Sequence, residues 1–199
     1  VGALALSVLN VCGKEVLDLG DGGPRLFFFV ASGIAIGSLL ASRLSGDHIE
    51  IGIVPIGGIL MTCGFAAVPF VNETLLAYGI TLVVAGIGGG LYLVPLAAFV
   101  QDRATGKEKG RVQGAQEMIT FLFIFASAIV FEVFRNEQLM ALSPEGAVFA
   151  LAALSLIGTL GVCLAVPHIS IRFPLWILVH SLYRVTVIGG EKIPRRGGV

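Results

Sequence analysis

Residues 86–117 of the chain read GIGGGLYLVPLAAFVQDRATGKEKGRVQGAQE. The first part is apolar and rich in glycine, and it changes abruptly to a charged segment before another apolar run starts. Long apolar runs separated by short basic segments are typical of membrane proteins, whose cytoplasmic loops collect lysine and arginine. This stretch therefore predicts two membrane helices joined by a cytoplasmic connection. The basic residues of that connection are Arg103, Lys107, Lys109 and Arg111.

The composition of the whole chain also favours an integral membrane protein. Of the 199 residues, 56% are hydrophobic and only 13% are charged, whereas globular proteins are about one quarter charged. The 13 basic and 13 acidic residues balance, so net charge gives no reason to expect nucleic acid as a partner. Each of the three cysteines stands alone within an apolar run, as core residues do. We therefore predict no disulfide, no metal and no cofactor.

Six apolar segments have about the length that a membrane-spanning helix needs, roughly 20 residues. The connections between them are short, so consecutive helices should be antiparallel neighbours in one bundle, with each backbone polar group bonded inside its own helix. The sequence thus predicts an all-α membrane protein with six transmembrane helices. These helices are expected at residues 1–17, 26–44, 51–71, 75–100, 115–134 and 147–166.

Basic residues are distributed unevenly between the two sides of such a bundle. The second and fourth connections and the tail after Val166 share one side, and they hold most of the 13 lysines and arginines. The other side holds only Lys14, Arg25 and Arg135. By the positive-inside rule, the even-numbered connections and the C-terminus are expected to be cytoplasmic.

Glycines recur at a spacing of four within two of the expected helices. Gly33 and Gly37 share one helix face, as do Gly86 and Gly90, and small residues on one face let helix backbones approach closely. Such faces can serve tight packing alone, or they can serve as contacts about which helices rock. Pro95, following the glycine cluster, is expected to weaken its helix locally, so this long helix should tilt or kink.

Ionisable residues near membrane depth are candidates for function. Glu117 is close in sequence to Arg111 and Gln113, which leaves two interpretations open: a structural salt bridge to the basic connection, or a role in coupling. Glu132 and Arg135 have the spacing of an ion pair on one helix near the interface. Lys14 and Glu15, at the end of the first segment, are also expected at the interface.

Six helices with cytoplasmic connections after the second and fourth resemble the C-terminal half of a major facilitator superfamily transporter, which consists of two six-helix halves. The connection after the second helix reads GSLLASRLSGDH from Gly37 to His48, and it resembles a degenerate form of the cytoplasmic signature of that superfamily. Arg43 matches the signature arginine, whereas Ser42 replaces the acidic residue and the following basic pair is absent.

Two further motifs narrow the resemblance. The run YLVPLAAFVQDR from Tyr92 to Arg103, followed by GRV at 110–112, is similar to the lysophospholipid transporters that are fused to an acyltransferase. The tail LYRVTVIGGEKIPRRGGV at 182–199 resembles the beginning of a glycerophospholipid acyltransferase domain, whose catalytic His-x4-Asp motif would come later. No catalytic residue is therefore expected in this chain.

The resemblance implies two parts. Residues 1–166 would be the transporter half, and residues 167–199 an amphipathic interfacial segment followed by the first strand of a truncated α/β acyltransferase domain. The chain starts within an apolar run without methionine and stops as a new pattern begins, so both ends are expected to be cut.

The function that the resemblance implies is movement of lysophospholipid across a bacterial inner membrane, followed by reacylation with acyl-carrier protein or acyl-CoA as the donor. A major facilitator exporter of small solutes or drugs, and a protein that acts chiefly as a membrane-bound acyltransferase, are the alternatives. Arginine suits a phosphate headgroup because its planar fork binds two oxygens, although the same arginines can simply determine topology. The candidates for gating or headgroup contact are Arg43, Arg103, Arg111, Gln113 and Glu117.

Overall fold

The computed structural model describes residues 1–20, 23–45, 50–71, 74–104, 106–136 and 138–165. Within these residues the chain is helical and contains no strand, which confirms the expected all-α class. The interfacial segment and the acyltransferase strand expected at 167–199 lie outside the described residues. The helices are α1 (Gly2–Glu15), α2 (Gly23–Ser45), α3 (Ile53–Ala67), the short 3-10 helix η1 (Val68–Phe70), α4 (Leu75–Arg103), the 3-10 helix η2 (Gly106–Glu108), α5 (Lys109–Arg135) and α6 (Pro144–Ala165).

Five helices of the described part are long and apolar enough to cross a membrane. They are α2, α3 together with η1, α4, α5 and α6, whereas α1 has only 14 residues. With 29 residues, α4 is about 43 Å long at 1.5 Å per residue, which exceeds a hydrocarbon core of about 30 Å. It continues as one uninterrupted helix through Pro95. A membrane-embedded helical protein is therefore the class that the fold defines.

The limits of α4 and α5 differ from those expected from hydropathy. The connection was expected to cover residues 101–114, but α4 continues to Arg103 and α5 already begins at Lys109. The residues that α5 adds at its start include lysine, arginine and glutamine, which favour helix without being apolar. A hydropathy pattern locates the apolar part of a helix and misses such polar ends. The connection therefore shrinks to residues 104–108.

Local signals account for three other helix ends. Thr74 caps α4 by accepting a hydrogen bond from the Ala77 amide at 3.4 Å. Ser143 accepts one from the Gly146 amide at 3.2 Å, and Pro144 follows it at the first position of α6, where a missing N–H costs nothing. Pro69 lies in η1, where its missing amide hydrogen interrupts the α-helical bonding and ends α3 before the expected residue 71.

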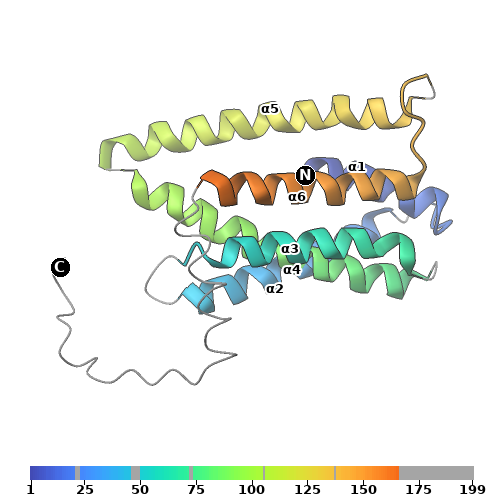
Figure 1. The fold of residues 1–199 in the computed structure, drawn as a ribbon, viewed down its shortest axis with the longest axis horizontal. Helices are drawn as coiled ribbons and strands as arrows, with labels where there is room; N and C mark the ends of the chain where they lie inside the picture. Colours follow the sequence, from blue (N-terminus) through green and yellow to red (C-terminus); the bar gives the residue numbers. More distant parts are fainter. Residues whose placement is uncertain (21–22, 46–49, 72–73, 105, 137, 166–199) are drawn as a thin grey trace.

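Helices α1 to α6 run roughly along the long axis of the molecule (Figure 1). The closest packing joins α2 and α3 to α4, and α6 packs on α3. By contrast, α5 lies along the opposite edge of the bundle, with α1 and α6 between it and the other helices (Figure 1). The bundle thus has a tightly packed side, formed by α2, α3 and α4, and a loosely packed side at α5.

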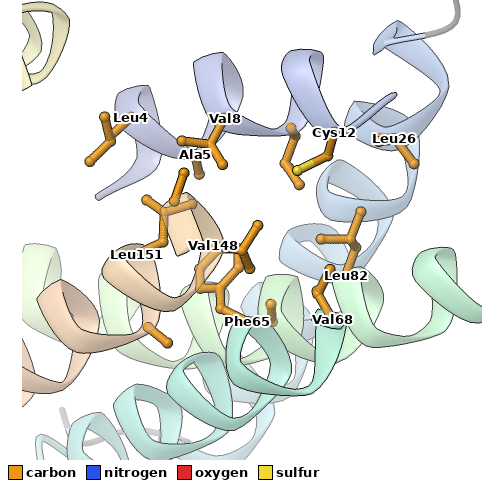
Figure 2. Close-up of a cluster of buried hydrophobic side chains, with 14 of the residues drawn as sticks. Leu4, Ala5, Val8, Cys12, Leu26, Phe65, Val68, Leu82, Val148 and Leu151 are labelled. Carbon is orange, nitrogen blue, oxygen red and sulfur yellow. The ribbon is translucent and has the colours of Figure 1, made fainter. Parts of the chain in front are cut away.

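The main core lies where α1 and α6 meet α2, α3 and α4, and Figure 2 shows its side chains converging from these helices. Membrane helices gain no hydrophobic driving force against each other, so packing and interhelical hydrogen bonds must hold them together. One such bond joins the hydroxyls of Thr62 on α3 and Ser155 on α6 at 2.9 Å. The labelled core residues are Leu4, Ala5, Val8, Cys12, Leu26, Phe65, Val68, Leu82, Val148 and Leu151.

Candidate functional site

The candidate residues of the segment at 86–117 gather where α4 ends and α5 begins. After Arg103 the chain extends through Ala104, which has φ −80° and ψ 120°, and then turns through η2 into α5. Arg111, Gln113 and Glu117 therefore lie on the first turns of a helix, although Arg111 and Gln113 were expected in a loop. Because a helix fixes the directions of its side chains, the polar side chains at this junction have more defined positions than a loop would give them.

A cavity of about 350 Å³ opens at this junction. Among the five residues that the sequence singled out for gating, only Gln113 lines it. The other polar lining groups are Gln101, on the last turn of α4, and Lys109, at the start of α5. Ala104, Gly110 and Val112 complete the wall. The cavity thus offers one cation and two amides, which are groups that can bind phosphate oxygens.

The start of α5 adds a favourable potential for an anion. The first amides of a helix have no partner within it, and the helix dipole places partial positive charge there. Glu108, the residue before α5, makes no capping hydrogen bond from its side chain. Negative charges are nearby at Asp102 and Glu108, but the basic residues Arg103, Lys109 and Arg111 outnumber them among the described side chains of the junction. The local balance is therefore positive.

The candidate arginines lie around this cavity rather than in it. Arg103 stacks on the ring of Phe99, one turn earlier on α4, with 5.0 Å from its guanidinium carbon to the ring centroid. Arg111 is exposed on the first turn of α5. Arg43 is exposed in the last turn of α2. None of the three lines the cavity, so each would meet a ligand only at its mouth or elsewhere on this face.

Glu117 bonds along its own helix. The side-chain amide of Gln113 donates a hydrogen bond to its carboxylate at 2.9 Å. The salt bridge to the basic connection, one of the two interpretations of Glu117, is absent from the described part of the chain. On the same part of α5, the side-chain oxygen of Gln116 is buried without a hydrogen-bond partner among the described residues, and Thr120 donates to the Gln116 carbonyl at 2.8 Å. These residues form a polar stripe on α5, defined as Gln113, Gln116, Glu117 and Thr120.

The glycines expected to pack helices lie at the crossing of α2 and α4. A Cβ added to Gly33 would lie 3.0 Å from the Gly86 Cα, and the reverse holds for Gly86. A Cβ added to Gly90 would lie 2.8 Å from the carbonyl carbon of Gly37. The two backbones are thus in contact. Pro95 is fully buried on the same helix.

Two features have no signal in the sequence alone. Lys109 appeared only as one of several basic topology residues, because its position beside Gln101 depends on the turn between α4 and α5. Arg135 was expected to pair with Glu132 on its own helix, but it donates instead to Glu15 of α1 at 2.8 Å, 120 positions away. Only tertiary structure can bring residues of such separation together.

Within the described residues, no group of three His, Cys, Asp or Glu side chains could hold a metal ion. These features define a membrane-embedded helical protein with a positive polar cavity at one end of a loosely packed helix. Comparison of the chain with protein-family models, with curated proteins and with solved structures finds no match.

Proposed function

We propose that residues 1–166 form one half of a major facilitator transporter that moves lysophospholipid between the leaflets of a bacterial inner membrane. The cytoplasmic side would be that of the α4–α5 junction and of the C-terminus, in agreement with its basic residues. In the same proposal, the tail leads into an acyltransferase domain that receives the lipid and takes its acyl group from acyl-carrier protein or acyl-CoA.

The observation that carries this proposal is the exposure of α5. Of its 27 residues only Phe134 is buried, and large apolar side chains such as Phe121, Phe123 and Phe125 are about 70% exposed. A helix exposed on all sides to lipid would have no use for a polar stripe, because polar groups at membrane depth are costly. An α5 that faces a second half of the transporter, across a pathway, accounts for both its apolar surface and its stripe.

The junction cavity supports a phosphate-bearing substrate. Its lysine, its two glutamines and the start of α5 all favour a negative group. The exposed apolar surface of α5 begins at Met118, beside the last residues of the polar stripe. A lysophospholipid has the same order of polar and apolar parts, since its phosphate headgroup is followed by one apolar chain.

The test uses the intact gene product in proteoliposomes, with labelled lysophosphatidylethanolamine as the probe and its movement between leaflets as the readout. Lys109→Gln should slow the initial rate roughly fivefold, the equivalent of about 1 kcal/mol for one partly exposed charged contact. Arg25→Gln is the matched control and should leave the rate unchanged. Arg25 is an exposed cation at the start of α2, at the end of the bundle away from the junction cavity.

Two outcomes would contradict the proposal. Intact protein that leaves the lysophospholipid where it started, but exports small solutes or drugs, would make it an exporter of another kind. Protein that acylates lysophospholipid supplied on the cytoplasmic side, without moving it between leaflets, would make it chiefly a membrane-bound acyltransferase.

A further inference from the structure

The end of α5 remote from the junction borders two more cavities, which the proposed cytoplasmic site does not use. One, of about 230 Å³, lies where α5 meets α1 and the start of α6. The other, of about 270 Å³, lies on the α1 side of the same contact. Val11, Phe131 and Arg135 line both, so these three side chains form the wall between them. The two cavities are therefore neighbouring halves of one recess, here called the α1–α5 recess.

Charges of both signs stand at this recess. Glu15 lines the first cavity and Lys14 the second, while Arg135 belongs to both. Arg135 donates to Glu15 at 2.8 Å, and each side chain of the pair is 47% exposed, so both remain reachable from outside. Lys14 is exposed and has no acidic partner within the described part of the chain. The recess thus holds one anion and two cations in fixed places.

The uncharged residues of the lining differ between the two cavities: they are mainly apolar in the first and include uncharged polar residues in the second. Phe131 and Phe134 contribute aromatic rings to the first cavity, the one that contains Glu15. An aromatic ring beside a carboxylate is a favourable environment for an ammonium group. Ser7 and Asn10 line the second cavity with Lys14, and a phosphate can accept hydrogen bonds from all three. Each half of the recess therefore suits one of two opposite charges.

We propose that the α1–α5 recess binds the zwitterionic headgroup of a single-chain phospholipid, with its ammonium against Glu15 and its phosphate between Lys14 and Arg135. This inference rests on the proposed function and adds the headgroup class and a second site to it. The recess is at the end of the bundle opposite the junction cavity, the end predicted to face outward. Since α5 has 27 residues, about 40 Å of helix separates its two ends.

The size of the recess restricts what enters it. Its two halves, of about 230 and 270 Å³, together fall at the lower part of the roughly 300–1,000 Å³ typical of small-molecule sites. That volume suits a headgroup whose two charged groups occupy one half each, and it leaves no room for an acyl chain as well. The chain would instead lie along the exposed apolar surface of α5, which continues from Phe131 on the same helix face through Ala128 and Ile124.

The experiment compares binding of two probes to the intact protein in nanodiscs: lysophosphatidylethanolamine, which is zwitterionic, and lysophosphatidylglycerol, which lacks the ammonium. Glu15→Gln should weaken binding of the first about tenfold and leave the second within twofold, because only the ammonium loses its partner. Lys14→Gln should weaken both. Glu132→Gln is the matched control: it removes an exposed carboxylate one turn before Arg135, outside both cavities, and should alter neither affinity.

A purely structural ion pair makes different predictions. In the exchanged variant Glu15→Arg with Arg135→Glu, a structural pair would be restored, and affinity for both probes would return to that of the wild type. A headgroup site would remain impaired for lysophosphatidylethanolamine, since its charges would be reversed. Recovery in this variant, or equal weakening of both probes by Glu15→Gln, would overturn the recess proposal. Failure of the wild-type protein to bind or move either lipid would instead overturn the proposed function.

Discussion

At the crossing of α2 and α4, two glycine-to-alanine substitutions differ only in whether the added methyl group meets the backbone of α2. Gly89 and Gly90 are adjacent in α4, and alanine favours helix over glycine by the same amount at both. A Cβ on Gly90 would lie 2.6 Å from the Ile34 carbonyl oxygen and the Ser38 amide nitrogen of α2. A Cβ on Gly89 would meet only side chains, Ile34 and Met61, at 3.9 Å. Gly90→Ala should therefore destabilise the protein and Gly89→Ala should not.

The magnitude follows from these distances. Ordinary contacts of a Cβ begin at 3.4 Å, so α2 and α4 must separate by about 0.8 Å at Gly90 (3.4 minus 2.6). A gap of that size loses a quarter to a half of the attraction between the atoms that move apart. Inserting a methyl group into such packing costs about 1–3 kcal/mol, while alanine returns about 1 kcal/mol of helix propensity at either position. Propensity cancels between the two variants, so their difference should be about 2 kcal/mol.

The assay is thermal denaturation of both purified variants in the same detergent, followed by size exclusion of the protein that remains folded. For a chain of 150–250 residues each kcal/mol shifts Tm by about 2–4 °C, so Gly90→Ala should melt roughly 4–8 °C below Gly89→Ala. Gly37→Ala, on the α2 side of the same contact, should resemble Gly90→Ala because its Cβ would lie 2.9 Å from the Ile87 backbone. Equal Tm values for Gly89→Ala and Gly90→Ala would refute a backbone contact between α2 and α4.

Two further predictions concern the core and the topology. Ser155→Ala removes the hydrogen bond to Thr62 and should lower the free energy of unfolding by about 0.6 kcal/mol, a typical value for such bonds between membrane helices. Ser155→Thr in the same melting assay distinguishes loss of the bond from loss of packing. An unchanged Tm for Ser155→Ala would contradict the contact. The topology can be tested in a cysteine-free background, because residues 106 and 136 flank α5 at opposite ends. Gly106→Cys should react with a membrane-impermeant maleimide only after cells are permeabilised, whereas Asn136→Cys should react in intact cells. The reverse pattern would invert the predicted orientation.

Hydropathy was sufficient for the class of protein because membrane helices must satisfy their backbone within each segment. Each expected helix has a counterpart in the structure, in the same order. The ends were less predictable. Polar helix-forming residues lengthened α5 at its start, whereas Pro69 shortened α3. Both effects arise from local backbone chemistry that a hydrophobic pattern does not record.

The candidate site was only partly accessible from the sequence. The basic cluster near Arg103 was visible as composition, and Gln113 was chosen for its proximity to Glu117. The cavity itself depends on how the turn at 104–108 places Lys109 beside Gln101, which no spacing along the chain specifies. The same is true of the α1–α5 recess, whose ion pair joins residues from the first helix and the fifth.

The sequence by itself determined that this protein is helical and built for a membrane, because apolar length and charge distribution follow directly from residue types. It also indicated which glycines could allow helices to approach, since their spacing places them on one face. Tertiary structure alone decided which helix they meet, that Arg135 bonds Glu15 rather than Glu132, and that α5 stands at the edge with its apolar and polar faces uncovered. Those outcomes depend on how whole helices cross, and the energy of a crossing is a sum over contacts between residues that are far apart in the chain.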